Sequence, residues 1–150
     1  DFEKALHKLC LNLAKQIVVD GEGAKKFVII NVIGARSQSM AKSVGFSIAN
    51  SPLCKTAIGA GDPNWGRIIM ACGKSGENIT ANKIQLKIGN YLVAEGGKVA
   101  KDYKEKEVRE YMKWGSINIE VNLNIGNVSY TVYTCDFTHD YIDINANYRN

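Results

Sequence analysis

The amino-acid sequence predicts an α/β protein of the α+β type, in which a mixed sheet is layered with helices. Two observations support this prediction. The nearly continuous apolar run at residues 27–33 is typical of a strand buried on both faces, and residues 84–93 and 117–132 alternate apolar and polar side chains around short turns. Helical spacings separate these strands, and no repeat or linker divides the chain. We therefore expect residues 1–150 to form a single domain.

The first half of the chain is expected to run from a helix into the buried strand and then into a second helix. Residues 2–18 place apolar side chains at steps of three and four, which predicts an amphipathic helix. The glycines of residues 20–23 end this helix, and Gly34 is expected to end the strand. A second helix is expected over residues 38–50, where Met40, Val44 and Ile48 share one stripe.

The stretch that follows is expected to be irregular. Residues 51–66 contain both prolines and three glycines, and a short helix is expected to start near Asn64 and to continue through residues 68–72. Asp62 could cap that helix, and Arg67 could pair with Asp62. From spacing alone, this structural explanation is as good as a catalytic one.

The second half is expected to contain two hairpins. The first turns at residues 89–90, and the second turns at residues 126–127, with a Gly-Asn pair at each turn. A two-residue loop in the second hairpin places Val121 directly opposite Val132 on one apolar face.

A charged helix and a terminal strand complete the predicted order. The helix is expected over residues 103–113, between the hairpins, with Val108, Tyr111 and Met112 on its buried side. Residues 137–144 are expected to form the last strand, because apolar residues continue almost to the end of the chain.

The composition excludes several classes of function. The net charge of +4 arises from 19 basic and 15 acidic residues, and the densest charged run, residues 98–113, alternates in sign, which argues against nucleic-acid binding. No apolar run is long enough to cross a membrane. The four cysteines form no C-x-x-C pair, so neither a metal site nor a disulfide framework is expected, and nothing calls for a cofactor. Cys10, Cys54 and Cys72 lie among apolar neighbours and are expected to be buried, in a cytoplasmic protein.

Few residues stand out as candidates for chemistry. His7 and His139 have no serine, cysteine and acid to complete a triad, so both are expected to be exposed polar residues. Glu22 is more suggestive, because a carboxylate between two glycines at a helix-to-strand joint could bind the ammonium group of an amino-acid-like ligand. A solvated turn is the alternative explanation.

Several segments together resemble one known family along essentially the whole chain. They read VDGEGA at 19–24, IANSPL at 48–53, KTA at 55–57, DPNWGR at 62–67, YTCDFT at 133–138 and INA at 144–146. Each segment is modest, but in this order and spacing they are highly specific. The sequence resembles the ornithine acetyltransferases, which are also the bifunctional glutamate N-acetyltransferases of arginine biosynthesis.

The resemblance implies a fold, a reaction and partners. Members of the family are precursors that cleave themselves into α and β chains, form a sandwich fold and assemble as α2β2 heterotetramers. The threonine exposed at the start of β carries acetyl from N-acetylornithine to glutamate. The sequence leaves open whether acetyl-CoA is a second donor. The present sequence starts at Asp1 without an initiator methionine. It is expected to be the later part of a β chain, with no catalytic residue of its own, and to expose apolar surface when it is alone.

The resemblance also implies substrate-binding residues. Glu22 matches a glutamate that holds a charged amine of ornithine, and Asn145 and the final residue, Asn150, match contacts to its polar end. The family usually has serine or threonine where Asn150 stands. It also commonly has aspartate at the position of Asn147, and a small hydroxyl residue at that of Lys25.

Two other functions remain open on the sequence. Related self-cleaving aminopeptidases share the architecture and would pass the acyl group to water instead of to glutamate. A non-catalytic amino-acid-binding domain is the second alternative. In that case the chain would bind ornithine or acetylornithine without a partner.

Overall fold

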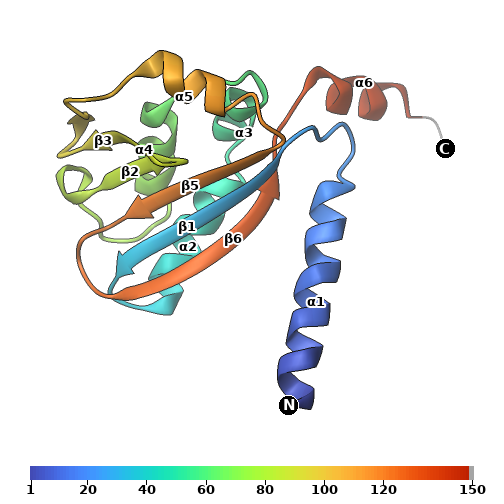
Figure 1. Cartoon of the computed structure of the whole chain (residues 1–150), viewed down its shortest axis with the longest axis horizontal. Helices are drawn as coiled ribbons and strands as arrows, with labels where there is room; N and C mark the ends of the chain where they lie inside the picture. Colours follow the sequence, from blue (N-terminus) through green and yellow to red (C-terminus); the bar gives the residue numbers. More distant parts are fainter. Residues whose placement is uncertain (149–150) are drawn as a thin grey trace.

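A computed structural model describes residues 1–148, and its centre is a six-stranded mixed sheet (Figure 1). The strand order is β4-β3-β2-β5-β1-β6; β1 and β5 are parallel, and the other neighbours are antiparallel. The strands are β1 (Phe27–Ala35), β2 (Gln85–Ile88), β3 (Tyr91–Glu95), β4 (Lys98–Val99), β5 (Ser116–Asn122) and β6 (Val128–Cys135). The helices are α1 (Phe2–Val19), α2 (Gln38–Ala49), α3 (Pro52–Gly59), α4 (Trp65–Gly73), α5 (Glu105–Tyr111) and α6 (His139–Asn147), with a 3-10 turn at Ala81–Lys83. The predicted α/β class is confirmed.

Strand β1 lies in the interior of the sheet, next to the edge strand β6. Val28, Ile30 and Val32 are completely buried, and β1 pairs with β5 on one side and with β6 on the other. The prediction of a second hairpin is therefore wrong, because β1 lies between β5 and β6, the two strands that the hairpin was expected to pair. The alternation could not reveal this, since Val121 and Val132 face the same layer whether they are neighbours or are separated by one strand. The connecting loop crosses the end of β1, where a Cβ atom on Gly126 would collide with the backbone carbonyl of Ala35.

Among residues 1–148, only one face of β1 is fully covered. Its residues alternate between buried and half-buried, and α2 packs on the buried face. The expectation of burial on both faces is thus only half met. Figure 1 shows no helix across the near face of β5, β1 and β6. Gly34 does not end the strand. It has a φ of +68° in a register irregularity, and β1 continues to Ala35.

The segment expected to be irregular contains helix α3. Ser51 caps this helix by accepting a hydrogen bond from the backbone N–H of Cys54, and Pro52 occupies the first turn, where its missing N–H costs nothing. Prolines and glycines were therefore a misleading signal here. The following helix, α4, is confirmed, with Asn64 as its N-cap.

The end of the chain also differs from the prediction. The predicted strand at residues 137–144 is wrong, because α6 begins at His139 and continues to Asn147. The hairpin of β2 and β3 and the helix α5 are confirmed, with Val108 and Met112 buried and Tyr111 half-buried.

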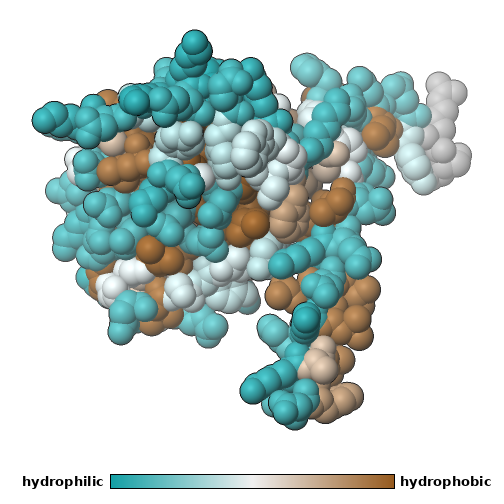
Figure 2. Space-filling view, viewed as in Figure 1, coloured by the Kyte–Doolittle hydropathy of each residue, from teal (hydrophilic) through white to brown (hydrophobic). Residues whose placement is uncertain are grey.

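Helix α1 extends away from the sheet, and its apolar side chains face solvent (Figures 1 and 2). This exposed apolar stripe consists of Phe2, Leu6, Leu9, Leu13 and Ile17. Cys10 lies on the same helix and is exposed, which contradicts its predicted burial, whereas Cys54 and Cys72 are buried as expected. Over residues 1–148, the structure contains no helix with the length and apolarity needed to cross a membrane.

Candidate functional site

The turn after α1 presents Glu22 at the surface. Helix α1 ends at Val19, and the chain turns through Gly21 and Gly23 before β1 begins. Gly21 leaves little room for a side chain, because a Cβ atom there would lie 3.2 Å from the carbonyl of Val18 and 3.3 Å from the sulfur of Cys135. The two glycines thus let the turn lie flat against the end of β6, which leaves the carboxylate of Glu22 exposed.

Gly23 is the point where this turn meets α6. Its φ of +68° suits glycine, and a Cβ atom would collide with the backbone nitrogen of Tyr141 in the first turn of α6. The hydroxyl of Thr138 donates a 2.6 Å hydrogen bond to the carbonyl of Gly23. Residues more than 110 positions apart are therefore held together by backbone contact.

This contact brings Glu22 and Asn145 together. The side-chain amide of Asn145 donates a 2.9 Å hydrogen bond to Oε2 of Glu22 and another of 2.9 Å to the backbone carbonyl of Tyr141. Both residues are exposed, so the pair lies on an open surface and not in an enclosed pocket. The third predicted site residue, Asn150, lies outside the described residues.

Of the three positions where a departure from the family pattern is expected, Lys25 and Asn147 lie within the described residues. Lys25 forms a 2.9 Å ion pair with Asp140, and the hydrogen bond that its ammonium donates to this carboxylate raises the pKa of this exposed lysine. Asn147 donates from its side chain to the carbonyl of Asp143, a contact within α6. Neither side chain touches Glu22.

The buried carboxylate of Asp136 stabilises the segment between α1 and β1. Asp136 is 2 % exposed, and its Oδ1 accepts hydrogen bonds of 2.9 Å from the backbone nitrogens of Lys25 and Lys26. Its other oxygen, Oδ2, has no hydrogen-bond partner among the described residues. The ammonium of Lys26 donates to the carbonyls of Ile58 and Gly59 at the end of α3, and burial lowers its pKa. A cation suits that position, because a helix presents unpaired carbonyls at its C-terminus.

A buried lysine completes this group. Lys55 is 7 % exposed, and its ammonium donates to the hydroxyl of Thr134 at 2.9 Å and to the carbonyl of Cys135. Sequence reasoning singled out neither Lys55 nor Asp136 as a functional residue. Both stand inside the KTA and YTCDFT segments, so the segments were a signal, but their roles depend on contacts between α3 and β6 that no local pattern reveals.

The DPNWGR segment lies apart from this site and serves the fold. Asn64, not Asp62, caps α4, and Arg67 donates to the carbonyl of Leu53 and to Thr56. Asp62 pairs instead with Arg109 of α5 at 3.5 Å. The predicted pairing of Arg67 with Asp62 is therefore wrong, because Arg67 points from α4 toward α3.

In the part of the chain that the structure describes, the remaining candidates for a site lie away from Glu22 and Asn145 or lack metal ligands. Within residues 1–148, no cluster of histidine, cysteine, aspartate and glutamate could hold a metal ion. His7 and His139 are both exposed, as expected. Two cavities, of about 460 Å³ beside Tyr91 and about 410 Å³ beside Ser47, contain neither Glu22 nor Asn145 in their walls.

Comparison with known proteins identifies the family. A model of the ArgJ family matches residues 1–150. The chain is 50 % identical over its whole length to the arginine biosynthesis bifunctional protein ArgJ of Ruegeria pomeroyi and 47 % identical to that of Gluconobacter oxydans, covering 37 % and 35 % of those proteins. It therefore spans little more than a third of the length of these curated relatives.

A solved structure agrees with both the fold and the family. The crystal structure of the arginine biosynthesis bifunctional protein ArgJ from Bacillus halodurans superposes with a TM-score of 0.94 at 42 % identity, over 98 % of this chain and 69 % of that one. This chain belongs to the ArgJ family, because the family model matches its full length, its relatives are up to 50 % identical and the fold is shared.

Proposed function

We propose that this chain is part of a bifunctional enzyme of arginine biosynthesis that moves an acetyl group from N-acetylornithine to glutamate. Membership of the ArgJ family, whose named relatives are arginine biosynthesis bifunctional proteins, supports the pathway. The observation that carries the proposal at this site is the Glu22–Asn145 hydrogen bond. It joins an exposed carboxylate and an amide, which suit the ammonium and the polar end of an amino acid.

The proposed reaction uses a threonine that lies outside these 150 residues. Its hydroxyl attacks the acetyl carbonyl of N-acetylornithine, the amine of ornithine leaves with the proton, and an acetyl-threonine ester remains. The amine of glutamate then attacks this ester, which releases N-acetylglutamate and restores the hydroxyl. The present chain contributes binding: Glu22 accepts hydrogen bonds from a substrate ammonium, and Asn145 and Asn150 bind its polar end.

The fate of the acetyl group separates this proposal from the hydrolase alternative. We expect the complete enzyme, meaning the self-cleaved precursor with both of its chains, to convert labelled N-acetylornithine and glutamate into labelled N-acetylglutamate. The assay follows label in N-acetylglutamate and in free acetate over the same time course. Label released mainly as acetate, at a rate unaffected by glutamate, would identify a hydrolase and contradict the proposal.

The α chain of the same precursor is the proposed partner, in an α2β2 assembly, and two uncovered surfaces support it. One is the apolar stripe of α1, which includes Phe2 at 80 % and Ile17 at 75 % exposure. The other is the open face of β1, where Ile29 and Ile33 are only half-buried although the strand is apolar almost throughout. Apolar surfaces of this kind mark interfaces in soluble proteins. The four free cysteines fit the reducing cytoplasm as the place where the enzyme works.

Thiol labelling tests whether a partner covers α1. Cys10 lies beside Leu6 and Leu13 on α1 and is exposed in this chain, so a maleimide should modify it in the isolated chain and not in the complete enzyme. Cys72 is the internal control, because burial raises its pKa to about 12 and keeps it a protonated, unreactive thiol in both samples. Mass spectrometry of the labelled chain reports each site. Equal labelling of Cys10 in both samples would show that no partner covers this helix.

A further inference from the structure

Lys55 carries a buried charge whose partners all belong to one short segment. Within residues 1–148, no carboxylate oxygen lies within 4.0 Å of its ammonium. The ammonium instead contacts Thr134, Cys135 and the ring of Phe137, whose centroid is 4.8 Å away. Burying a charge is costly unless hydrogen bonds and an aromatic face replace its water. The partners therefore hold Lys55, and Lys55 in turn fixes the segment from Thr134 to Phe137.

The same segment is clamped to α3 by its backbone. The N–H of Phe137 donates a 3.1 Å hydrogen bond to the carbonyl of Lys55. Gly59, one turn further along α3, has no side chain because a Cβ atom there would collide with the carbonyl of Phe137. The link between β6 and α6 thus lies directly on α3, with Lys55 at its centre.

A continuous series of contacts connects Phe137 to Asn145 and Glu22 in the candidate site. The ring of Phe137 stacks on that of Tyr141, with centroids 4.7 Å apart and planes inclined by 14°. The carbonyl of Tyr141 accepts the hydrogen bond from the side chain of Asn145, and the same amide group donates to Glu22. The position of Phe137 therefore acts together with the contact between Gly23 and α6 on where Asn145 lies relative to Glu22.

We propose that Lys55 is a positioning residue for substrate binding: its buried ammonium orients the Phe137–Tyr141 stack and thereby holds Asn145 against Glu22. The inference rests on the proposed function, because it assigns Lys55 a role in presenting the proposed substrate contacts. Lys55 itself touches no substrate. Its effect on binding is transmitted through α6.

The test uses the complete enzyme and three variants. Lys55→Met keeps the length of the side chain and removes its charge, and we expect the N-acetylornithine concentration for half-maximal acetyl-enzyme formation to rise about fivefold, with the maximal rate changed less than twofold. Lys42→Met is the matched control, because it removes a surface ammonium 5.9 Å from the Phe46 ring. Val93→Ala, in the hairpin of β2 and β3, lowers the melting temperature by loss of core packing and should leave this concentration unchanged.

A double variant shows whether Lys55 acts through Glu22. In a Glu22→Gln background, Lys55→Met should add less than a twofold further rise, because the contact of residue 22 with the substrate ammonium, which Lys55 serves through Asn145, is already weakened. Independent, multiplicative effects would overturn the inference. So would a Lys55→Met enzyme that melts lower, as Val93→Ala does, but binds N-acetylornithine normally.

Two further results keep the inference testable and separate from the proposed function. If Lys55→Met does not fold, Phe137→Leu replaces it, since this change keeps apolar volume and removes the aromatic ring, and the same fivefold rise is expected. If Phe137→Leu leaves the N-acetylornithine concentration for half-maximal acetyl-enzyme formation unchanged, the inference is overturned. If Glu22→Gln alone leaves binding unchanged, the proposed role of the site fails. If Glu22→Gln weakens binding and Lys55→Met does not, only the inference about Lys55 fails.

Discussion

Replacing Glu22 by glutamine in the complete enzyme should raise the N-acetylornithine concentration for half-maximal acetyl-enzyme formation by about ten- to a hundredfold, the range expected for loss of a charge-assisted hydrogen bond. Glutamine keeps a side-chain oxygen that can accept the hydrogen bond from Asn145, so the change removes charge with little change of shape. Because Glu22 is exposed and supports no core packing, self-cleavage and folding should be unaffected. Rapid-quench measurement of acetyl-enzyme formation gives the binding effect, and separation of the α and β chains on a denaturing gel reports cleavage.

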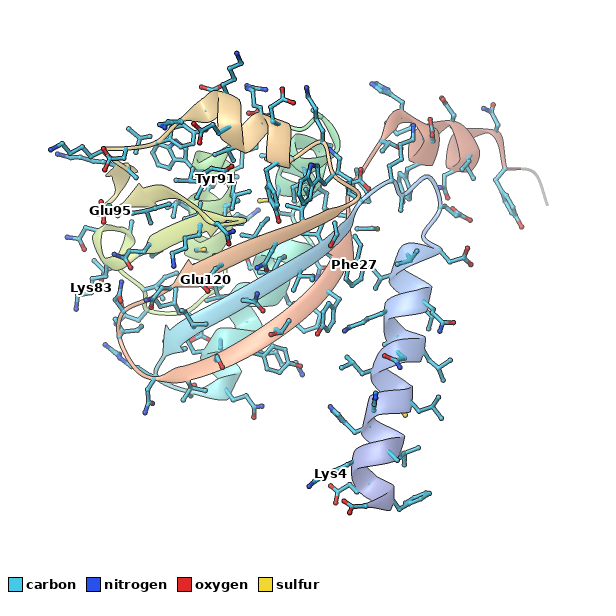
Figure 3. The ribbon with its side chains drawn as sticks, in the orientation of Figure 1. Lys4, Phe27, Lys83, Tyr91, Glu95 and Glu120 are labelled. Atoms are coloured by element: carbon cyan, nitrogen blue, oxygen red, sulfur yellow. The ribbon has the colours of Figure 1, made fainter. Side chains whose placement is uncertain are left out.

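Glu95 offers a matched control for this variant. It is exposed at the end of β3, on the part of the sheet away from α1 and α6 (Figure 3), and Glu95→Gln changes net charge by the same amount. We expect Glu95→Gln to bind N-acetylornithine normally. A Glu22→Gln enzyme that binds normally, or a precursor that stays uncleaved, would remove Glu22 from its assigned role.

Gly23→Ala should damage the same site through the backbone. Alanine at a φ of +68° costs about 1–2 kcal/mol in conformational strain, and its Cβ atom would also collide with the backbone of Tyr141. Helix α6 must then move away from the turn, which separates Asn145 from Glu22. We expect a melting temperature several degrees lower and more than a tenfold loss of N-acetylornithine binding, measured by thermal unfolding and by the acetyl-enzyme assay.

A Gly96→Ala variant is a control that separates the backbone strain of alanine at positive φ from the steric collision with α6. Gly96 has a φ of +59°, but a Cβ atom there meets nothing within 4 Å, so Gly96→Ala carries the strain without the displacement. This control should melt slightly lower than the unmodified enzyme and bind substrate as well as it does. If the Gly23→Ala and Gly96→Ala enzymes bind N-acetylornithine equally well, the approach of α6 to the turn has no part in binding.

Local sequence patterns predicted those helices and turns that depend on interactions between residues close in sequence. The spacing of apolar residues over 2–18 and 38–50 is helical because one side of each helix is apolar, and both helices are observed. The Gly-Asn turn at 89–90 joins β2 to β3 as expected. The prediction for α3 was wrong because Pro52 stands at the one place in a helix where proline is favourable, the first turn.

Local patterns could not predict which strands are neighbours. Strands β5 and β6 alternate as a hairpin would, yet β1, remote in sequence, inserts between them. It does so because an interior position gives this almost wholly apolar strand hydrogen-bonded neighbours along both of its edges. The burial of Cys10 was predicted from its apolar neighbours, but those neighbours face outward on α1, which packs little against the rest of this chain.

The sequence by itself determined the α/β class, the order of most elements, the family and Glu22 and Asn145 as candidates, because these depend on periodicity and on short motifs. Only the tertiary structure decided that Glu22 and Asn145 meet and that the end of the chain is helical. It also revealed the support from Lys55 and Asp136 on α3 and at the end of β6. The physical reason is distance along the chain: contacts between residues 20–26, 51–59 and 134–145 arise from the packing of separate elements around β1, which no local pattern encodes.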